Sequence, residues 1–395
     1  MMVTIDMLYD AQRILNEVAR QTPVAAVPNA GEGVYIKAEN LQLTGSFKLR
    51  GAYYKIATLS EEEKANGVIA CSAGNHAQGV ALAAARRGIR STICIPAGAP
   101  LMKVEATRNY GSEVVLVPGV YDDAYAKAME LTKEKGLTFI HPFDDERVIA
   151  GQGTIGLEIL QQIPDIDAVI VPIGGGGLIS GVAYAVKTLR PSCKVYGVQA
   201  EGAPSMFHSI RNGQIETLDS VSTIADGIAV KKPGSITFEM CRKYVDEVVT
   251  VSESEISTAI LTLMEQNKTV AEGAGAVALA AALYKKVDIA GKKVCCIVSG
   301  GNIDVTTLSH VITRGLYKTG RITEFTTKVP DKPGQLFTLL QLLSETGANL
   351  LTVTHERDSV DVGFCVVKMT METRNAEHRI QIKELLESRG YEVTR

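Results

Sequence analysis

One lysine in a run of small and aromatic residues offers the clearest chemistry in this chain. The run Thr44-Gly45-Ser46-Phe47-Lys48 places that lysine after a small-residue turn and next to an aromatic ring. A lysine amine in a partly apolar pocket has a lowered pKa and becomes a usable nucleophile. Lys48 is therefore a candidate Schiff-base lysine. The alternative is an ordinary surface lysine at the start of a helix.

Three glycine-containing turns offer further ligand contacts. Each turn follows an apolar run that predicts a buried strand; the turns are Ser72 to His76 after 68–71, Gly174 to Gly177 after 168–173, and Ser299 to Asn302 after 294–298. Continuous apolar strands predict a parallel sheet that is covered on both faces and binds ligands at the carboxyl ends of its strands. We expect all three turns to lie on one such sheet edge.

Four consecutive glycines predict an anion site. Backbone entropy makes such a run costly except where a ligand approaches the chain closely. A helix that begins after Gly174 to Gly177 would offer N–H groups and a positive dipole end to a phosphate. No Lys-Ser/Thr follows, as a P-loop requires, and Ser180 departs from the dinucleotide fingerprint. Glu201, at the end of the next predicted strand, leaves a nucleotide cofactor open as an alternative, and a plain tight turn is another.

The other two turns carry polar side chains. Asn75 and His76 suit a carboxylate or a phenolic oxygen, although Asn75 would also suit a helix cap. Ser299 suits a ligand contact or a strand-end hydroxyl. Their grouping with a lysine and an anion site favours the ligand roles.

Several longer blocks resemble those of fold-type II pyridoxal phosphate enzymes, specifically threonine ammonia-lyases (threonine dehydratases). The run 37–52 is similar to the family's cofactor-lysine segment, and the likeness extends from about residue 10 to residue 320. The other blocks, in the family's order, are SAGNHAQG (72–79), GQGTIGLE (151–158), GGGGLISG (174–181), ADGIAV (225–230), AEGAGA (271–276) and SGGNID (299–304). The resemblance implies an α/β, tryptophan synthase beta-like fold with two parallel-sheet domains and pyridoxal 5'-phosphate as cofactor.

The resemblance also implies roles for individual residues. Lys48 binds the cofactor covalently and later moves the Cα proton; the glycines hold the phosphate, Asn75 the ring oxygen, and Ser299 faces the pyridine nitrogen. The implied cofactor-binding set is Phe47, Lys48, Asn75, Gly174, Gly175, Gly176, Gly177, Leu178 and Ser299. The implied site for the substrate carboxylate is Ser72, Ala73, Gly74, Asn75 and His76.

The type of residue at position 299 bears on the reaction. A hydroxyl opposite the ring nitrogen makes a shallower electron sink than a carboxylate would, which favours expulsion of a β leaving group. We therefore expect β-elimination of L-threonine to 2-oxobutanoate and ammonia, with L-serine giving pyruvate as a side activity. A biosynthetic and a catabolic role are both open.

Other activities on the same scaffold remain open. One is an L-serine ammonia-lyase and another a serine racemase, but racemases carry a serine where this chain has Ala73. Their divalent metal site pairs a glutamate with a second acid six residues on; Glu201 matches the first and Phe207 does not match the second. We expect no divalent metal, with Glu201 as the one candidate ligand; a monovalent ion held mainly by carbonyls stays open. A non-enzymatic amino-acid-binding protein would be expected to lose Lys48 or the glycines.

Composition narrows the class further. The chain has 395 residues, 41 Lys plus Arg against 44 Asp plus Glu, and a net charge of −3 without a basic cluster, so we expect no nucleic-acid partner. No apolar run reaches about 18 residues and none resembles a signal peptide, so we expect no membrane span. The seven cysteines form no Cys-x-x-Cys pair. We expect buried thiols in a cytoplasmic protein.

The organisation changes near residue 320. We expect a large cofactor-binding domain from 1–50 and 151–320, a small catalytic domain from 51–150, and a separate unit from 325–395. In the last unit we expect strands at 325–329, 349–355, 360–371 and from 391, with helices at 335–346 and 376–388. This βαββαβ order is a ferredoxin-like unit.

Two turns of the C-terminal unit resemble those of ACT domains, which pair and bind small effectors. The residues that carry this resemblance are Asp331, Gly334, Gly347 and Asn349. We therefore expect a homo-oligomer, a dimer or a tetramer, with a small-molecule effector whose identity and sign are open. A dimerisation module that binds nothing is the alternative.

Overall fold

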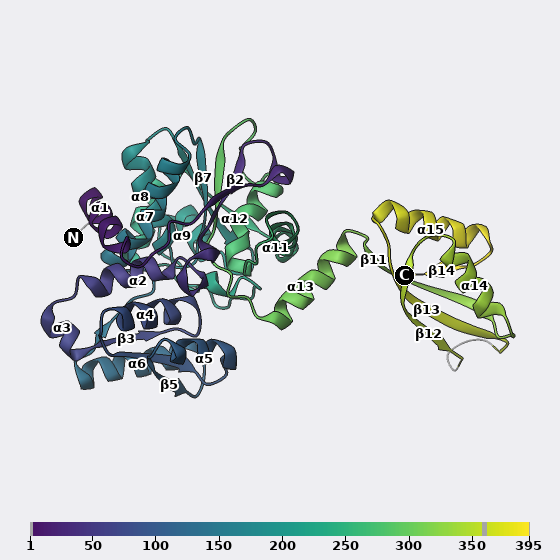
Figure 1. Cartoon of the computed structure of the whole chain (residues 1–395), viewed down its shortest axis with the longest axis horizontal. Coiled ribbons are helices and arrows are strands. Elements are labelled where there is room, and N and C mark those ends of the chain that lie inside the picture. Colours follow the sequence, from purple (N-terminus) through teal and green to yellow (C-terminus); the bar gives the residue numbers. More distant parts are fainter. Residues whose placement is uncertain (1–2, 358–361, 395) are drawn as a thin grey trace. The chain divides into compact units, whose positions relative to one another are not determined.

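The computed structural model describes residues 3–357 and 362–394 and divides the chain into two compact units (Figure 1). The first unit is Met1–Asp304 and the second is Val305–Arg395. This division lies ahead of the expected change near residue 320, because helix α13 (Val305–Lys318) belongs to the second unit.

A six-stranded sheet forms the larger part of the first unit. Its order is β1-β2-β10-β7-β8-β9; β1 is antiparallel to β2 and the other neighbours are parallel. Its strands are β1 (Val24–Ala26), β2 (Val34–Ala38), β7 (Ala168–Pro172), β8 (Lys194–Ala200), β9 (Glu247–Val251) and β10 (Val294–Val298). Strands β7 and β10 are buried along their whole length, as predicted for strands covered on both faces.

Helices cover the two faces of this sheet (Figure 1). The helices α7 (Glu146–Gln162), α8 (Gly177–Leu189) and α10 (Ser235–Tyr244) share one core with the sheet, and α12 (Gly273–Leu283) lies on the other face. Helix α12 consists mostly of alanine and glycine, and these small residues let it pack directly on the strands.

A second, smaller parallel sheet has the order β5-β4-β3-β6. Its strands are β3 (Val68–Cys71), β4 (Ser91–Pro96), β5 (Glu113–Val117) and β6 (Thr138–Phe139). Helices α2 (Lys48–Ala57) and α4 (Asn75–Arg86) share a core with one face, and α6 (Tyr121–Lys135) packs on the other. The expectation of a single sheet edge was therefore wrong, since the turn after β3 belongs to a different sheet from the turns after β7 and β10.

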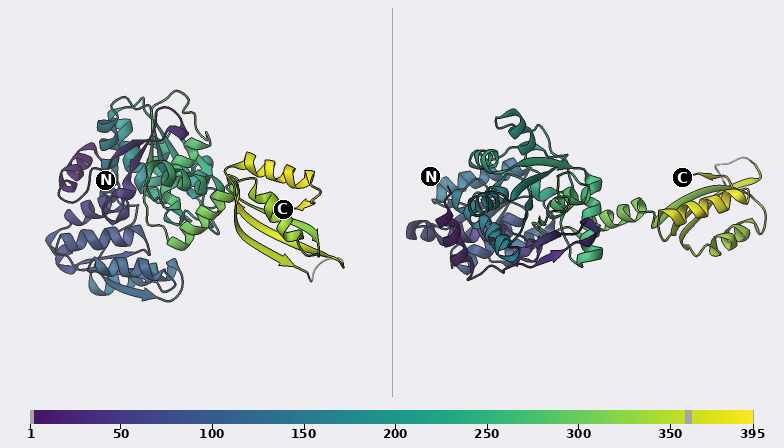
Figure 2. Two further views of the ribbon diagram at one scale, coloured as in Figure 1. Left: turned by 45° about the vertical axis from the view of Figure 1, so that its right-hand side comes forward. Right: turned by 90° about the horizontal axis from the view of Figure 1, so that it is seen from above.

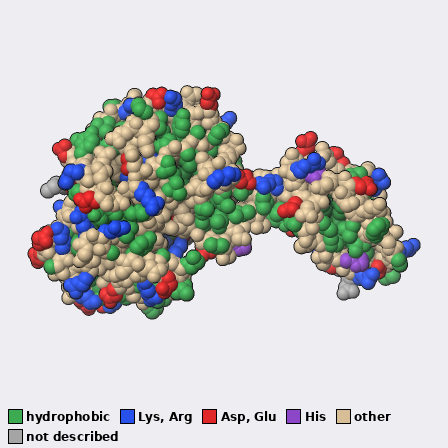
Figure 3. Space-filling model, viewed as in Figure 1, with side chains coloured by type: hydrophobic (Ala, Val, Ile, Leu, Met, Phe, Trp, Pro, Cys, Tyr) green, Lys and Arg blue, Asp and Glu red, His purple; other side chains and the backbone are tan. Residues whose placement is uncertain are grey.

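The remaining elements of the first unit connect these layers. They are α1 (Ile5–Leu15), α3 (Glu61–Asn66), α5 (Leu101–Asn109), α9 (Ser205–Asn212), α11 (Glu253–Asn267) and the 3-10 turns η1 (Pro28–Ala30), η2 (Glu39–Leu41), η3 (Leu43–Gly45) and η4 (Asp226–Ile228). No helix among the described residues is long and apolar enough to cross a bilayer. Acidic and basic side chains are interspersed over the face drawn in Figure 3.

The second unit has the predicted βαββαβ order after α13. Its elements are β11 (Ile322–Pro330), α14 (Gln335–Ser344), β12 (Asn349–Glu356), β13 (Phe364–Glu372), α15 (Ala376–Ser388) and β14 (Val393–Thr394). The antiparallel sheet order β12-β13-β11-β14 is that of a ferredoxin-like unit. Both helices pack on one face of the sheet (Figure 2). The first part of the predicted strand 360–371 falls in 358–361, outside the described residues.

Candidate active site

Lys48 is the first residue of helix α2, and the preceding turn ties it to the end of β10. Thr44 and Gly45 both have positive φ, 66° and 70°, which reverses the chain. The Phe47 N–H then donates to the Ser299 carbonyl at 3.1 Å. Lys48 Nζ donates to the Pro142 carbonyl at 2.9 Å and lies 5.3 Å from the centre of the Phe47 ring.

The surroundings of Lys48 change its acidity. Burial lowers the pKa of Lys48 to about 8, while the Glu272 carboxylate acts in the opposite direction. A larger share of the amine is therefore unprotonated near neutral pH than in a solvated lysine. This is the environment that the sequence predicted for a nucleophilic lysine.

The glycine turn lies between β7 and α8 and is connected to Lys48 through Phe143. Gly176 has φ 99°, which favours glycine, and α8 begins at Gly177. A Cβ at Gly175 would overlap the Phe143 ring, and one at Gly177 would lie 2.9 Å from the Phe143 Cα. Phe143 follows the Pro142 carbonyl that Lys48 contacts. Because the first N–H groups of a helix have no partner within it, this turn suits a phosphate close to Lys48.

The turn after β3 meets the turn after β10 across the two sheets. Ser72 to Asn75 are half-buried, and the Ser72 hydroxyl accepts a hydrogen bond from the Gly74 N–H at 3.1 Å. The Asn302 amide donates to Asn75 Oδ1 at 2.6 Å. A Cβ at Gly74 would meet no atom within 4 Å, so the turn borders open space. Two sheets, and not one edge, bring the predicted residues together.

His76 differs from its predicted role. The ring is buried, its Nε2 hydrogen-bonds the Ile140 carbonyl at 2.8 Å, and burial, with Lys48 adding to the effect, lowers its pKa to about 3. The ring is neutral and already engaged. We therefore restrict the predicted substrate contact of His76 to its backbone.

Ser299 and Leu178 are both buried, at 2% and 5% exposure. The Ser299 hydroxyl donates to the Ala274 carbonyl at 3.3 Å, a long bond that the hydroxyl proton can exchange for a bond to a ligand acceptor. Leu178 packs in the core beneath the glycine turn, so its N–H is the group that it can offer.

Glu272 lies inside the AEGAGA block, but its type and spacing alone predicted no role for it. Its carboxylate accepts a hydrogen bond from Asn75 Nδ2 at 2.7 Å and is 4% exposed. Burial, and secondarily Asp226, raises the pKa of Glu272 to about 7. A buried carboxylate with a raised pKa beside Lys48 is typical of a functional site. The one signal in the sequence was an acid within a run of glycine and alanine.

The GQGTIGLE block positions Lys48 from a distance. A Cβ at Gly151 of α7 would lie 2.7 Å from the Arg50 carbonyl and from the Gly51 Cα of α2. Arg50 is buried and pairs with Glu39 at 2.8 Å and Glu158 at 2.6 Å. Glycine contacts and buried ion pairs therefore hold α2, which carries Lys48, against α7.

The residues predicted to bind a metal or an effector do not come together as the cofactor-site residues do. Glu201 is exposed at the end of β8, and the one group of three metal-capable side chains found in the described ranges does not include it. Asp331 and Gly334 lie between β11 and α14, whereas Gly347 lies between α14 and β12 and Asn349 is the first residue of β12. The register places Asn349 opposite Glu372 and Pro330 opposite Phe364, at opposite ends of β13. One copy of the chain cannot join these residues in one small site.

The first unit thus presents an amine of lowered pKa, an anion-binding turn and a buried hydroxyl, a donor set that fits a phosphorylated aldehyde with a basic ring nitrogen. The family model described as "Pyridoxal-phosphate dependent enzyme" matches residues 15–300. The chain belongs to this family.

Relatives of known name indicate a particular branch of the family. The chain is 52% identical to the L-threonine ammonia-lyase of Thermotoga maritima over 99% of both chains, and 48% identical to that of Geobacter sulfurreducens over 92% of this chain and 91% of the relative. Among solved structures, a processed threonine deaminase of Solanum lycopersicum shares 40% identity with a TM-score of 0.74, covering 79% of this chain and 89% of that one. Maize serine racemase shares 38% identity with a TM-score of 0.75, covering 80% of this chain and 99% of that one.

Proposed function

We propose that this protein is a pyridoxal phosphate-dependent L-threonine ammonia-lyase. It converts L-threonine to 2-oxobutanoate and ammonia by β-elimination, and L-serine to pyruvate as a side activity. The observation that carries the proposal is the half-buried Lys48 amine, with its pKa lowered to about 8, which is bound to the Pro142 carbonyl and feels the charge of Glu272. Near-complete coverage by two L-threonine ammonia-lyases supports the choice of substrate.

Bound pyridoxal phosphate supplies the electron sink that makes the Cα proton of the substrate acidic. Lys48 supplies the amine that anchors the cofactor and then carries the Cα proton. The 2.9 Å bond to the Pro142 carbonyl orients Nζ, and burial keeps the amine from being permanently protonated. Both tasks need an amine that exchanges a proton near neutral pH.

The other residues bind and orient. The N–H groups from Gly174 to Leu178 hold the phosphate at the start of α8. Phe47 supports the ring, Asn75 binds its oxygen, and the Ser299 hydroxyl faces its nitrogen. Glu272 holds Asn75 through the 2.7 Å hydrogen bond, so it positions the residue that orients the cofactor.

The substrate carboxylate binds in the turn from Ser72 to His76. This turn is half-buried up to Asn75 and borders open space at Gly74, so a small amino acid can enter it. The start of α4 at Asn75 adds a positive dipole end to the N–H groups of the turn.

A racemase is the second candidate, because a serine racemase covers 80% of this chain with a TM-score of 0.75. Racemisation needs a proton donor on the face of the substrate opposite Lys48. Ala73, in the substrate turn, has no exchangeable side-chain proton. Elimination is therefore favoured over racemisation.

A coupled assay separates the two reactions. L-Threonine should yield 2-oxobutanoate and ammonia in equal amounts, and L-serine should yield pyruvate without accumulation of D-serine on chiral chromatography. The Ala73→Ser variant is a matched probe, since it introduces a hydroxyl at this position. Racemisation of L-serine by the unaltered protein at a rate comparable to elimination would contradict the proposal.

The second unit is proposed to regulate and not to catalyse. One solved threonine deaminase matches 76% of this chain, and that match covers 99% of the threonine deaminase. The rest of this chain therefore has no counterpart in that structure. The edge strand β12 exposes Leu350 and Leu351, which suits pairing with a second copy. Two copies would bring the Asp331 turn of one chain to the Asn349 turn of the other, and an amino-acid effector would bind between them. We expect such a homo-oligomer to act in the cytoplasm, where its seven unpaired cysteines stay reduced.

A further inference from the structure

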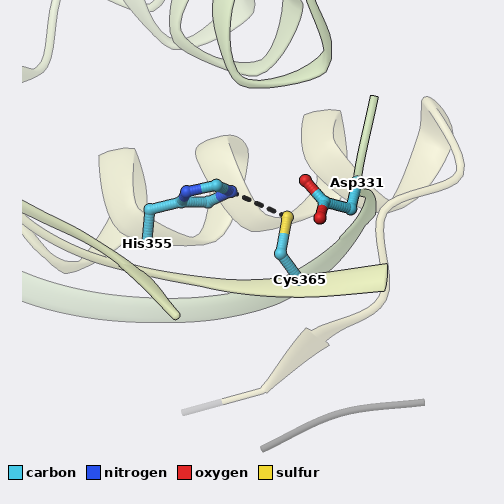
Figure 4. A group of neighbouring side chains, drawn as sticks. All are labelled: Asp331, His355 and Cys365. Carbon is cyan, nitrogen blue, oxygen red and sulfur yellow. Dashed lines mark hydrogen bonds between the residues drawn. The ribbon is translucent and has the colours of Figure 1, made fainter. Parts of the chain in front are cut away.

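Three side chains of metal-ligating type converge at one end of the C-terminal sheet (Figure 4). They are Asp331, His355 and Cys365, and one ligand atom from each lies within 4.8 Å of the others. The His355 Nε2 and the Cys365 Sγ are 2.9 Å apart. The Asp331 carboxylate approaches the sulfur from the opposite side to the imidazole (Figure 4). Within the described ranges, this is the group of three such side chains that the structure brings together.

The backbone fixes this convergence. Strand β13 pairs with β11 on one side and β12 on the other, and Cys365 lies opposite Val329, two residues before Asp331. On the other side His355 lies opposite Val367, diagonal to Cys365. The three groups therefore come from adjacent strands and the turn that follows one of them. Such a site is held by sheet hydrogen bonds and not by mobile side chains alone.

We propose that Asp331, His355 and Cys365 bind a divalent ion of the Zn²⁺ type. Thiolate, imidazole and carboxylate are all ligands that Zn²⁺ accepts, and a soft thiolate disfavours Mg²⁺ and Ca²⁺. With bonds of about 2.0–2.3 Å, a tetrahedral ion holds its ligands roughly 3.3–3.7 Å apart. The ligand atoms of Asp331, His355 and Cys365 reach these separations through shifts of about 1 Å. The side chains of Asp331 and His355 are exposed, so they can move by this amount. Three protein ligands leave one position for water or another small ligand.

Binding of the ion would release the proton of the Cys365 thiol and displace Arg357 from its ion pair with Asp331. When the ion binds, the Cys365 thiol loses its proton to solvent and a metal–sulfur bond replaces the S–H bond. Arg357 Nε now pairs with Asp331 at 3.0 Å, but its side chain is 64% exposed and is free to turn into water. The ion would then hold the Asp331 turn to β12 and β13. If the proposed regulation is correct, this turn belongs to the effector site, so the metal would alter the effector response as well.

The test uses the full-length protein with its cofactor, stripped of metal by a chelator and titrated with Zn²⁺ or Co²⁺. The unaltered protein should bind one more ion per chain than the His355→Ala variant binds. X-ray absorption at the zinc edge should show one sulfur neighbour of the ion at about 2.3 Å. His355→Ala and Cys365→Ala should each weaken binding by more than about 100-fold, which exceeds the usual cost of losing an outer hydrogen-bond partner of a ligand. Arg357→Gln should tighten binding several-fold, because it removes the cation that competes for Asp331.

The controls separate this proposal from the catalytic one. His310→Ala removes an exposed histidine of α13 and should leave Zn²⁺ binding unchanged. Lyase turnover reports on the first unit, so the metal site can fail while the proposed function stands, and the reverse. Should Cys365→Ala fail to fold, Asp331→Asn and the exposed His355 variant still decide the question. Absence of a stoichiometric ion, absence of a sulfur neighbour, or equal affinity in the His355→Ala variant would overturn the proposal.

Discussion

At the scale of single residues, the candidate site depends on two groups of opposite charge, the half-buried Lys48 and the buried Glu272. Burial lowers the pKa of Lys48 to about 8 and raises that of Glu272 to about 7, so both change protonation near neutral pH. Asn75 connects Glu272 to the site through the 2.7 Å hydrogen bond. A small change in pH or in a neighbouring charge therefore alters the amine and the carboxylate together.

The raised pKa of Glu272 makes stability depend on pH. Its value rises from 4.5 to about 7 on folding. Between these two values the folded chain keeps a proton that the unfolded chain has lost, so stability falls as pH rises. Glu272→Gln removes this loss and keeps the acceptor for Asn75. Relative to that of the unaltered protein, the free energy of unfolding of the variant should increase by up to about 3 kcal/mol from about pH 4.5 to above pH 7.

Urea unfolding of the cofactor-free protein at several pH values measures this difference. Glu105→Gln serves as the control, since Glu105 pairs with Arg108 at the surface and a neutral residue there should cost about 0–1 kcal/mol at any of these pH values. If the difference in the free energy of unfolding between Glu272→Gln and the unaltered protein does not change with pH, the pKa of Glu272 is not raised in the folded protein.

At the scale of elements, the position of Lys48 depends on how closely α2 and α7 pack. Gly151 and Gly51 let the two helices touch through their backbones, and Gly51 also donates its N–H to Gln152 at 3.1 Å. The end of α2 that carries Lys48 is thus aligned by contacts one turn further along the helix. Small residues here fix the position of the helix that carries Lys48.

The substitution Gly151→Ala tests this alignment. The added methyl group would overlap the backbone of α2, which should cost about 1–3 kcal/mol of stability despite the better helix propensity of alanine. A shift of Lys48 by about 1 Å should lower kcat by about 10- to 100-fold. Gly98→Ala is the matched control, because a Cβ there meets no atom within 4 Å. Equal kcat values for the two variants would refute the positioning role of this contact.

Much of the fold was predictable at this scale, because local pattern determines it. The strands at 68–71 and 294–298 were predicted with the bounds that the structure gives, and the helix at 376–388 likewise. The apolar pattern alone placed 68–71 on the same sheet edge as 168–173 and 294–298, because β3 and β7 have the same pattern, whereas the expected domain bounds of 51–150 already separated it from them. The hydrogen bond of the His76 ring and the position of Glu272 were not predicted, for a similar reason. Both depend on partners far along the chain, Ile140 and Asn75.

At the scale of the whole molecule, the chain combines two separately packed units. Each has its own core, and every residue proposed for catalysis lies in Met1–Asp304. An effector can act only through a difference in affinity between two states of the protein. A regulatory unit is therefore expected to change the substrate response without supplying any reacting group.

Removal of the ferredoxin-like part of the second unit, which follows α13, tests this division. A chain that ends at Lys318 keeps α13 whole and should retain turnover within a few-fold. It should lose any effector response, which typically amounts to about 5- to 150-fold in affinity. Substrate saturation curves measured with and without branched-chain amino acids, threonine and serine compare the two chains. Identical curves for both under all conditions would mean that the second unit does not regulate.

The two-copy effector site predicts complementation between variants. Asp331→Asn and Asn349→Ala alter turns at opposite ends of the sheet, so each should abolish the response alone. When the two variant chains are unfolded and refolded together, mixed pairs contain one intact site and one with both changes. The mixture should recover part of the response. No recovery in verified mixed pairs would place the effector site within a single chain.

The central claim is that Lys48 carries the cofactor at the glycine turn, and covalent trapping tests it most directly. Borohydride reduction of the purified protein, followed by peptide mapping with mass spectrometry, identifies the lysine to which the cofactor is attached. We predict that the modified peptide contains Lys48, and that Lys48→Ala yields no modified peptide and loses turnover by several orders of magnitude. Attachment of the cofactor to any other lysine, or full turnover by the Lys48→Ala variant, would contradict the account.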